Sequence, residues 1–468
     1  MIKSIILAVA CIAFFGIHCA DAVEKPNIIF ILADDLGWGD LGCYGQKTIQ
    51  TPSLDRLAKQ GTLFTQFYVN GSVCSPSRCA FFTGQYPARQ KIHGHFAAVD
   101  SNAARGMSQY LDPNVANIAK LLKQSGYKTA HVGKWHLGSN SGGPEPEAYG
   151  FDFVGSTEKD GANGPANDPY YRAKSSELFV NEALGFIEQN KGAPFYLQLW
   201  TLVPHATLNP TPEQMEPYAK LRAGGKGFPH ASAAEIFSAS VTDLDTQIGR
   251  LIDGLDRLGL SKNTLVVFSS DNGPEDIHIA NAGHSGIGSA GPFRGRKRSL
   301  YEGGVRVPFI VRWPDTVPAN TINENTVVAG VDLLPTLCEL SGATTPTDTK
   351  LDGESVADVL QGSSRARKNP LFWEWRFRIA GEPFHHSPQL AVRDGDWKLY
   401  LNPDQKRVEL YDMKADLTQL DNVSEHHPEV VARLSQLAIQ WSKSLPEGPR
   451  DPGAGTMQFS VPKHASLP

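Results

Sequence analysis

Five apolar runs, separated by stretches with helical periodicity, constrain the fold of this chain more than any other feature. The runs occupy residues 27–33, 128–132, 195–200, 264–269 and 308–312. Continuous apolar runs of this length are typical of strands that are buried on both faces of a parallel sheet. The helical stretches lie at residues 114–125, 175–189 and 233–258. Because strands alternate with helices, the sequence predicts an α/β domain with a central, mostly parallel sheet flanked by helices.

The sequence changes character after about residue 370. Short apolar runs at 390–393, 397–400 and 408–411 are separated by turn residues. Asp394-Gly395-Asp396 lies between the first two runs and is a hairpin signal. Apolar spacing predicts a terminal helix over residues 428–442. We therefore expect a small C-terminal α+β domain with an antiparallel sheet. The expected domains are residues 23–370 for the large domain and 371–468 for the small domain with its tail.

The segment 1–22 has the pattern of a secretory signal peptide. Lys3 supplies a positive charge, residues 5–17 form an apolar core, and Ala20-Asp21-Ala22 resembles a cleavage site. The apolar core is too short for a transmembrane helix. The sequence therefore predicts cleavage near Ala22 and export to the periplasm or the extracellular space, with no stable membrane span.

Charge and cysteine content exclude two classes of protein. The net charge is −5 over 468 residues, and no basic tail or repeated Lys/Arg stripe indicates a nucleic-acid partner. Two of the six cysteines would leave with the signal peptide. The four that remain are Cys43, Cys74, Cys79 and Cys338. They are too few for a disulfide scaffold, so we expect one bridge at most.

Polar side chains follow four of the predicted strands directly. In order along the chain they are Asp34, Asp35, Lys134, His136, His205, Asp271 and Asn272. In open α/β sheets, ligands bind at the carboxyl ends of the strands. Taken one at a time, each residue is explained equally well by a turn, a helix cap or a satisfied core group. Their coincidence at one edge of the sheet favours a functional site.

The oxygen ligands in this set predict a divalent cation. Two adjacent carboxylates repel each other unless a cation lies between them. Three carboxylates and an amide suit Ca²⁺ or Mg²⁺ better than a soft metal, and no His or Cys spacing indicates zinc. The predicted ligands are Asp34, Asp35, Asp271 and Asn272. Cationic side chains nearby would then surround an anion on the cation. They are Arg78, Lys134, His136, His205 and Lys297.

The segment Cys74-Ser75-Pro76-Ser77-Arg78 carries the most specific short motif. A Cys, a Pro two residues on and an Arg four residues on resemble the signature by which type I sulfatases convert a cysteine to formylglycine, an aldehyde. The following residues, 79–87, continue that pattern. Without the rest of the chain, an ordinary loop cysteine before a helix explains Cys74 as well.

Further segments resemble the same family, the type I (formylglycine-dependent) sulfatases of the alkaline-phosphatase-like superfamily. With the cysteine motif, the matching segments are 27–35, 74–87, 126–136, 203–205, 270–273 and 297–304. The resemblance extends over residues 25–441 and implies a sulfuric ester hydrolase. It also implies one divalent cation, usually Ca²⁺, bound by the four predicted ligands and by the formylglycine at position 74. A formylglycine-generating or other sulfatase-maturing enzyme is the implied partner.

The resemblance also implies a mechanism and residue roles. One hydroxyl of the hydrated aldehyde at position 74 attacks sulfur and displaces the alcohol, which leaves a sulfo-enzyme intermediate. The second hydroxyl then loses its proton, the aldehyde forms again and sulfate is expelled. Arg78 would orient the hydrate, Lys134 and Lys297 would bind sulfate oxygens, and His205 would protonate the leaving alcohol. His136 would assist the second step as base or orienting group.

The substrate is less constrained. The basic run 294–298 exceeds that of many sulfatases and favours an anionic sugar, and the candidate substrate-binding residues are His93, His95, His278, His284, Arg294 and Arg296. His385 and His386 are candidates from the small domain. Leu417 and Gln419 replace a Pro and a Glu of many relatives, which affects a structural turn. We expect a sulfated polysaccharide or oligosaccharide that contains galactose or hexosamine.

Three other functions stay open at this point. A phosphodiester or phosphonate monoester hydrolase of the same superfamily uses similar chemistry. A two-metal phosphatase would place Ser or Thr at position 74 and add histidine ligands. An inactive glycan-binding protein would need no nucleophile, so the intact set of acids and bases counts against it.

Overall fold

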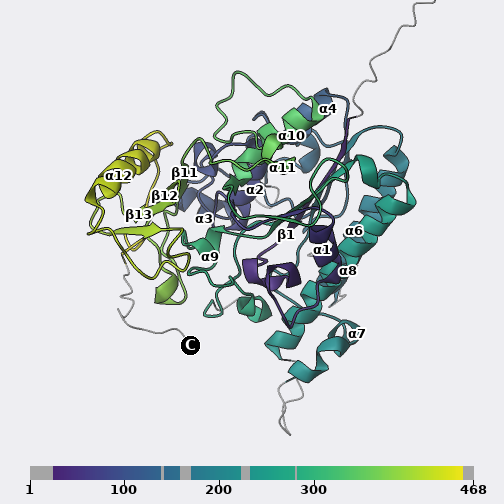
Figure 1. Ribbon diagram of the computed structural model, residues 1–468, viewed down its shortest axis with the longest axis horizontal. Helices are drawn as coiled ribbons and strands as arrows, with labels where there is room; N and C mark the ends of the chain where they lie inside the picture. The colour runs from purple at the N-terminus through teal and green to yellow at the C-terminus, as the bar shows by residue number, and fades with distance from the viewer. Residues whose placement is uncertain (1–24, 139–141, 159–169, 223–231, 280–281, 457–468) are drawn as a thin grey trace, which may run out of the picture.

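The computed structural model describes residues 25–138, 142–158, 170–222, 232–279 and 282–456. A large α/β body carries a smaller C-terminal sheet and helix at one end (Figure 1). The predicted signal peptide and the end of the tail lie outside the described residues. Among the described helices, none is both long and apolar enough to cross a bilayer.

The large body is built on an eight-stranded sheet with the order β5-β4-β6-β1-β7-β8-β2-β9. The strands are β1 Asn27–Ala33, β2 Thr62–Phe64, β4 Lys128–Gly133, β5 Phe153–Val154, β6 Phe195–Trp200, β7 Thr264–Ser270, β8 Phe309–Arg312 and β9 Thr321–Asn323. From β5 to β7 all neighbours pair in parallel. Strands β1, β4, β6, β7 and β8 were predicted, whereas the short strands β2, β5 and β9 were not. The mostly parallel sheet is confirmed.

Strand β8 pairs antiparallel with both of its neighbours, β7 and β2. The expectation of a parallel strand at residues 308–312 is therefore wrong. Because β8 runs opposite to β7, it begins at the edge of the sheet where β7 ends. An apolar run reports burial and not direction, so the sequence pattern did not distinguish the two cases.

Helices cover both faces of this sheet. Alternate residues of β1 point to opposite sides, and both sets are apolar and buried. Ile29 and Ile31 belong to the core beneath α1 Pro52–Lys59, α6 Tyr171–Asn190 and α8 Ala233–Arg257. Ile28 and Phe30 belong to the core beneath α2 Cys74–Thr83, α4 Ile118–Gln124 and α10 Leu333–Ser341. The shorter elements are α3 Val99–Ala104, α7 Pro212–Met215, α9 Glu302–Val305, α11 Ala357–Leu360, β3 Phe67–Tyr68 and β10 Val328–Ala329.

The three helices predicted in the large domain are present, but α6 begins four residues before the predicted start and α4 begins four residues after it. Residues 114–117 are not helical, and α4 begins at Ile118 because the Asn117 side chain accepts a hydrogen bond from Lys120 N and caps the helix.

The C-terminal sheet is antiparallel, with the order β11-β12-β13-β14. Its strands are β11 Leu371–Glu374, β12 Leu390–Asp394, β13 Trp397–Leu401 and β14 Val408–Asp412, and α12 Pro428–Lys443 packs against them. Gly395 takes a positive φ of 60° in the β12–β13 turn, as the hairpin signal predicted. The small α+β unit is confirmed, although β11 was not predicted. Its apolar residues join the core beneath α2, so the two sheets share one core.

A buried ion cluster connects the C-terminal sheet to α9 and β3. Lys398 on β13 donates to Glu302 Oε1 at 2.6 Å, and Arg306 lies 3.2 Å from Glu302 Oε2. Tyr68 also donates to this carboxylate at 2.6 Å. Burial alone would raise the pKa of Glu302, but Lys398 and Arg306 outweigh it and lower the pKa to about 2. The carboxylate therefore stays ionised and holds the C-terminal sheet to α9.

We predict that Glu302→Gln destabilises the protein strongly. Lys398 and Arg306 would stay buried without a carboxylate partner among the described residues, which costs about 3–5 kcal/mol in the free energy of unfolding. Urea unfolding followed by tryptophan fluorescence measures the change. Asp404→Asn is the control, because its 4.0 Å pair with Lys406 is exposed and is worth about 0–1 kcal/mol. Equal losses in the two variants would contradict the role of the cluster.

Candidate active site

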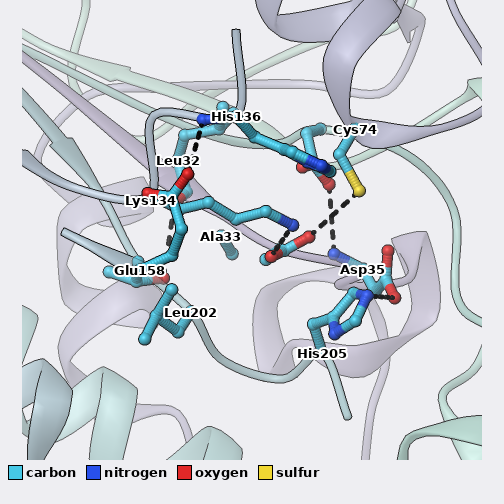
Figure 2. A network of polar contacts seen from close by, with 12 residues as sticks. Leu32, Ala33, Asp35, Cys74, Lys134, His136, Glu158, Leu202 and His205 are labelled. Atoms are coloured by element: carbon cyan, nitrogen blue, oxygen red, sulfur yellow. Dashed lines mark hydrogen bonds and ion pairs between the residues drawn. The ribbon is translucent and has the colours of Figure 1, made fainter. Parts of the chain in front are cut away.

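The structure brings the predicted polar side chains together at the carboxyl edge of the central sheet. Asp34 and Asp35 follow β1, Lys134 follows β4, and Asp271 follows β7. The start of α2 adds Cys74 from one side. Figure 2 shows side chains from these separate elements pointing toward one another.

Cys74 is the first residue of α2 and is almost fully buried. Its Sγ lies 3.6 Å from Asp34 Oδ1 (Figure 2). Burial raises the pKa of the Cys74 thiol to about 12, although Lys134 and Lys297 act in the opposite direction. A thiol that stays protonated at neutral pH is a poor nucleophile. The unmodified side chain is therefore unsuited to attack a substrate. All four described cysteines are free, and none forms the single bridge that the sequence allowed.

Arg78 lies one helical turn beyond Cys74 and is fully buried. Its Nε and one terminal nitrogen donate to Asp271 Oδ2 at 3.1 and 2.7 Å, and the other donates to the Lys134 carbonyl at 2.7 Å. Its guanidinium also lies 5.1 Å from the centre of the Trp200 ring. The side chain thus fixes α2 against the ends of β4 and β7.

Two lysines neutralise the two adjacent aspartates. Lys134 Nζ donates to Asp34 Oδ2 at 2.5 Å, and Lys297 Nζ donates to Asp35 Oδ1 and Oδ2 at 2.6 and 2.7 Å. Burial alone would raise the pKa of each aspartate. Lys134, together with His205, Arg78 and Lys297, outweighs burial and holds the pKa of Asp34 well below its usual value. Lys297, with His205, likewise lowers the pKa of Asp35. Both carboxylates are therefore ionised at neutral pH.

The pKa of the third carboxylate, Asp271, shifts in the opposite direction. Burial and the negative charge of Asp34 raise the pKa of Asp271 to about 7, against the effect of Arg78. Asp271 Oδ1 also accepts a hydrogen bond of 3.1 Å from the Asp35 backbone N, and Asp35 itself has a positive φ of 67°. A further positive charge at this position would favour ionised Asp271.

The oxygen-rich centre fits a hard divalent cation. One potential ligand atom from each of Asp34, Asp35, Cys74 and His205 lies within 4.8 Å of the other three. Asn272 donates its Nδ2 to Asp35 Oδ1 at 2.7 Å, whereas its buried Oδ1 accepts no hydrogen bond from the described residues. A buried amide oxygen without a donor is costly unless another positive group satisfies it. Asp34, Asp35 and Asn272 are therefore suited to Ca²⁺ or Mg²⁺, with Asp271 bonded to Asp35 beside them.

The two histidines of the site differ in environment. His205 is about a third exposed, its Nδ1 lies 2.7 Å from the Ala206 carbonyl, and its Nε2 lies 3.7 Å from Asp35 Oδ2. Nε2 is the ring nitrogen that points toward the cluster (Figure 2). His136 is more enclosed, with Nε2 at 3.2 Å from the Phe96 carbonyl. Burial lowers the pKa of His136 well below its usual value, so this ring is neutral.

Two acidic residues that the sequence reasoning missed support the site. Glu158 accepts hydrogen bonds from Trp135 N at 2.7 Å and His136 N at 2.9 Å, and His136 has a positive φ of 49° (Figure 2). Glu275 pairs with Arg298 and lies 3.8 Å from Lys297. Glu275 follows the Asp271-Asn272-Gly273 turn closely and could have been suspected there. No local pattern marks Glu158.

The structure buries Arg294 and leaves Arg296 partly buried. Arg294 Nε donates to the Phe384 carbonyl at 2.8 Å, and its guanidinium lies 4.0 Å from the centre of the Tyr301 ring. Arg296 donates to the backbone carbonyls of Glu275 at 2.8 Å and of Gly286. Both guanidiniums therefore bond within the protein, and their role in substrate binding stays a prediction.

The candidate substrate-binding histidines separate into two groups. His95 lies beside Phe96, whose backbone N donates to Ser75 Oγ at 3.0 Å, next to Cys74. The other candidates do not join it, and each has its own surroundings. His93 pairs with Glu374, His278 pairs with Asp276, His284 lies in a short turn, His385 accepts from Gly295 N, and His386 lies beside it. Of this set, only His95 adjoins the site.

Comparison with known proteins gives matches over most of the chain. The family model described as Sulfatase matches residues 26–343, and the model described as N-sulphoglucosamine sulphohydrolase, C-terminal, matches residues 291–443. An N-acetylgalactosamine-6-O-sulfatase of Bacteroides thetaiotaomicron is 30% identical over 88% of this chain and 92% of its own length. An N-acetylgalactosamine-6-sulfatase of Rattus norvegicus is 33% identical over 82% of this chain and 73% of its own.

Solved structures give the same picture. The crystal structure of Ps i-CgsB in complex with k-i-k-neocarrahexaose has a TM-score of 0.74 and 27% identity, and it covers 92% of this chain and 96% of its own. The family model of residues 26–343 spans β1 to α10 and so includes each of the residues gathered at the carboxyl edge.

We predict that Ca²⁺ or Mg²⁺ stabilises the protein through the carboxylates at this edge. A ligand present at a hundredfold excess over its Kd adds about 2.7 kcal/mol to the free energy of unfolding. Thermal unfolding of chelator-treated protein, with and without each cation, measures the effect. Asp35→Asn should lose the upward shift in Tm, and the exposed control Asp421→Asn should keep it. A full shift in Asp35→Asn would place the cation elsewhere.

Proposed function

The chain belongs to the sulfatase family and is therefore a sulfuric ester hydrolase, and from this premise we propose that it hydrolyses sulfate esters of carbohydrates. The names of the relatives support this substrate class, since two of them are N-acetylgalactosamine-6-sulfatases and Ps i-CgsB was solved in complex with k-i-k-neocarrahexaose. Within the class, we favour galactose- or hexosamine-containing glycans.

We further propose that Cys74 is converted to formylglycine by a maturing enzyme. The observation that carries this proposal is the position of Cys74 Sγ, 3.6 Å from Asp34 and enclosed by lysines and aspartates. Its raised thiol pKa makes the unmodified cysteine unreactive there, in the one place where a nucleophile is needed. The hydrated aldehyde would supply one hydroxyl to attack sulfur and a second to release sulfate.

The cation, with Ca²⁺ favoured over Mg²⁺, would be held by Asp34, Asp35, Asp271 and Asn272 together with residue 74. When bound, it would polarise the sulfate oxygens and favour an ionised hydroxyl at residue 74. The orphaned Asn272 Oδ1 and the two ionised aspartates support this assignment.

The remaining side chains have complementary proposed roles. Arg78, fixed by Asp271, would orient residue 74. Lys134 and Lys297 would stabilise the charge on the sulfate oxygens, since their ammonium groups lie within the cluster, one bonded to Asp34 and the other to Asp35. His205 would donate a proton from Nε2 to the oxygen of the leaving alcohol, because Nδ1 bonds to the Ala206 carbonyl and Nε2 points toward the cluster. His136 would act in the second step, as base or orienting group.

Two properties of the whole chain complete the proposal. The charged start, apolar core and Ala20-Asp21-Ala22 site support export, to the periplasm or outside the cell. A division near residue 370, just before β11, separates the large catalytic domain from the antiparallel sheet and α12.

We predict that Cys74→Ala abolishes turnover of 4-nitrophenyl sulfate, because no other described side chain can supply the nucleophile at this position. Cys79→Ala is the matched control, since it removes a buried thiol from the same helix away from the cluster and should leave turnover within about twofold.

Mass spectrometry of the Cys74 peptide from the native host should show oxygen in place of sulfur and two hydrogens, or the corresponding hydrate. An unmodified thiol in active protein would contradict the proposed nucleophile. Faster hydrolysis of 4-nitrophenyl phosphate than of the sulfate would favour a phosphoester hydrolase instead.

We predict that His205→Gln slows poor leaving groups selectively. A sugar alkoxide needs a proton as it leaves, so kcat for a sulfated sugar should fall about 10²–10⁴-fold, whereas 4-nitrophenolate leaves without one and should be affected far less. His278→Gln, outside the cluster, is the control. Equal losses on both substrates would assign His205 to binding or to cation coordination and leave the proton donor to another group.

A further inference from the structure

A cavity of about 630 Å³ lies between the large body and the C-terminal part of the chain. Three segments distant in sequence form its walls, at residues 94–105, 375–380 and 449–452, with Arg298 as a fourth element. Its size is that of a ligand pocket for a small molecule or a few sugar rings. The roles proposed above for the site residues do not use it.

The walls of this cavity carry four arginines, namely Arg105, Arg298, Arg378 and Arg450. Two of them bond to carboxylates, because Arg298 pairs with Glu275 and Arg450 lies 3.2 Å from Glu374. The other two have no carboxylate partner within 4 Å among the described residues.

Arg105 and Arg378 are therefore the free cations of the cavity. Arg105 donates only a long hydrogen bond of 3.4 Å to the His95 carbonyl, and its guanidinium lies 5.4 Å from the centre of the Phe377 ring. Arg378 is exposed, and it is its backbone N, not its guanidinium, that bonds to Asp451. Planar guanidiniums with unused donors are suited to carboxylate and sulfate oxygens.

The aromatic side chains of the cavity suit a sugar ring. Trp375 and Phe377 lie 5.3 Å apart between ring centres in an edge-to-face arrangement. Ligand pockets combine such apolar faces with a few placed polar groups. A cavity of this composition is suited to an anionic saccharide.

Two of the residues that line the cavity, His95 and Arg298, are chain neighbours of residues that contact the catalytic cluster. His95 lines the cavity, and the next residue, Phe96, bonds through its backbone to Ser75 and to the His136 ring. Arg298 also lines it and directly follows Lys297, whose ammonium bonds to Asp35. A substrate with its sulfate ester at Cys74 could therefore extend a neighbouring sugar past His95 and Arg298.

We propose that this cavity binds a second anionic group of the substrate, a carboxylate or another sulfate on the saccharide beside the ester that is hydrolysed. Arg105 and Arg378 would bind that group, with Arg298 at the entrance. This inference rests on the proposed activity toward carbohydrate sulfates. It adds arginines that face a cavity to the candidate substrate-binding residues, whereas Arg294 is buried and bonds to the Phe384 carbonyl.

The test uses three sulfated hexosamine disaccharides and the full-length protein. The first carries a hexuronate carboxylate on the second sugar, the second carries a sulfate there instead, and the third has the carboxylate reduced to an alcohol. Calorimetry measures the Kd of each, and hydrolysis of 4-nitrophenyl sulfate is followed separately. We expect at least one anionic disaccharide to bind about tenfold more tightly than the reduced one, and the stronger of the two identifies the group recognised.

Arg378→Ala and Arg105→Ala should each remove most of this preference while 4-nitrophenyl sulfate turnover stays within about twofold, because that ester carries no second acid. Arg378→Lys should restore part of it. Arg257→Ala, an exposed arginine at the end of α8, should change nothing. Equal Kd values for all three disaccharides, or a preference that survives in both alanine variants, would overturn the cavity proposal. Absence of sulfate turnover by the wild-type protein would instead overturn the proposed function.

Discussion

The site depends on a balance of buried charges at the carboxyl edge of the central sheet. Asp34, Asp35 and Asp271 lie within one small region that water does not reach, and three ionised carboxylates there would repel one another strongly. Lys134 and Lys297 each bond directly to one of them, and Arg78 bonds to the third. Burial and Asp34 nonetheless raise the pKa of Asp271 to about 7, so these cations do not fully offset the carboxylates, and a divalent cation held here would favour ionised Asp271.

The same balance explains how much of the site could be predicted from the sequence. Strand ends at one edge of a parallel sheet meet whatever the loops do, so Asp34, Lys134, His205 and Asp271 could be placed by counting from apolar runs. Glu158 could not be placed this way, because it belongs to no strand end and acts only by accepting two backbone N–H groups. The direction of β8 was missed for a similar reason, since apolar patterns carry no information on chain direction.

The basic loop shows where residue type is a poor guide to position. The charged side chains of residues 294–298 have different partners. Arg294 stacks on Tyr301 and bonds to the Phe384 carbonyl, whereas Lys297 bonds to Asp35. A run of charges looks uniform in a sequence, whereas its partners come from separate segments, such as Phe384, 90 residues away, and Asp35, 262 residues away. The sequence therefore indicates a basic loop but not which of its side chains bonds to which segment.

Gln419 illustrates how the C-terminal unit tolerates a change from the pattern of many relatives. Its Oε1 accepts a hydrogen bond of 2.9 Å from Glu302 N, and its Nε2 donates to Tyr400 OH at 2.5 Å. A glutamate there would lose that donated hydrogen bond and add a negative charge next to Glu302. Because Glu302 already balances Lys398 and Arg306, a neutral amide keeps this second buried cluster compensated. In the loop before α9, Arg294 bonds to Tyr411 and Gln419 and Lys297 bonds to Asp35, so this loop links the position of the C-terminal sheet to the position of Asp35.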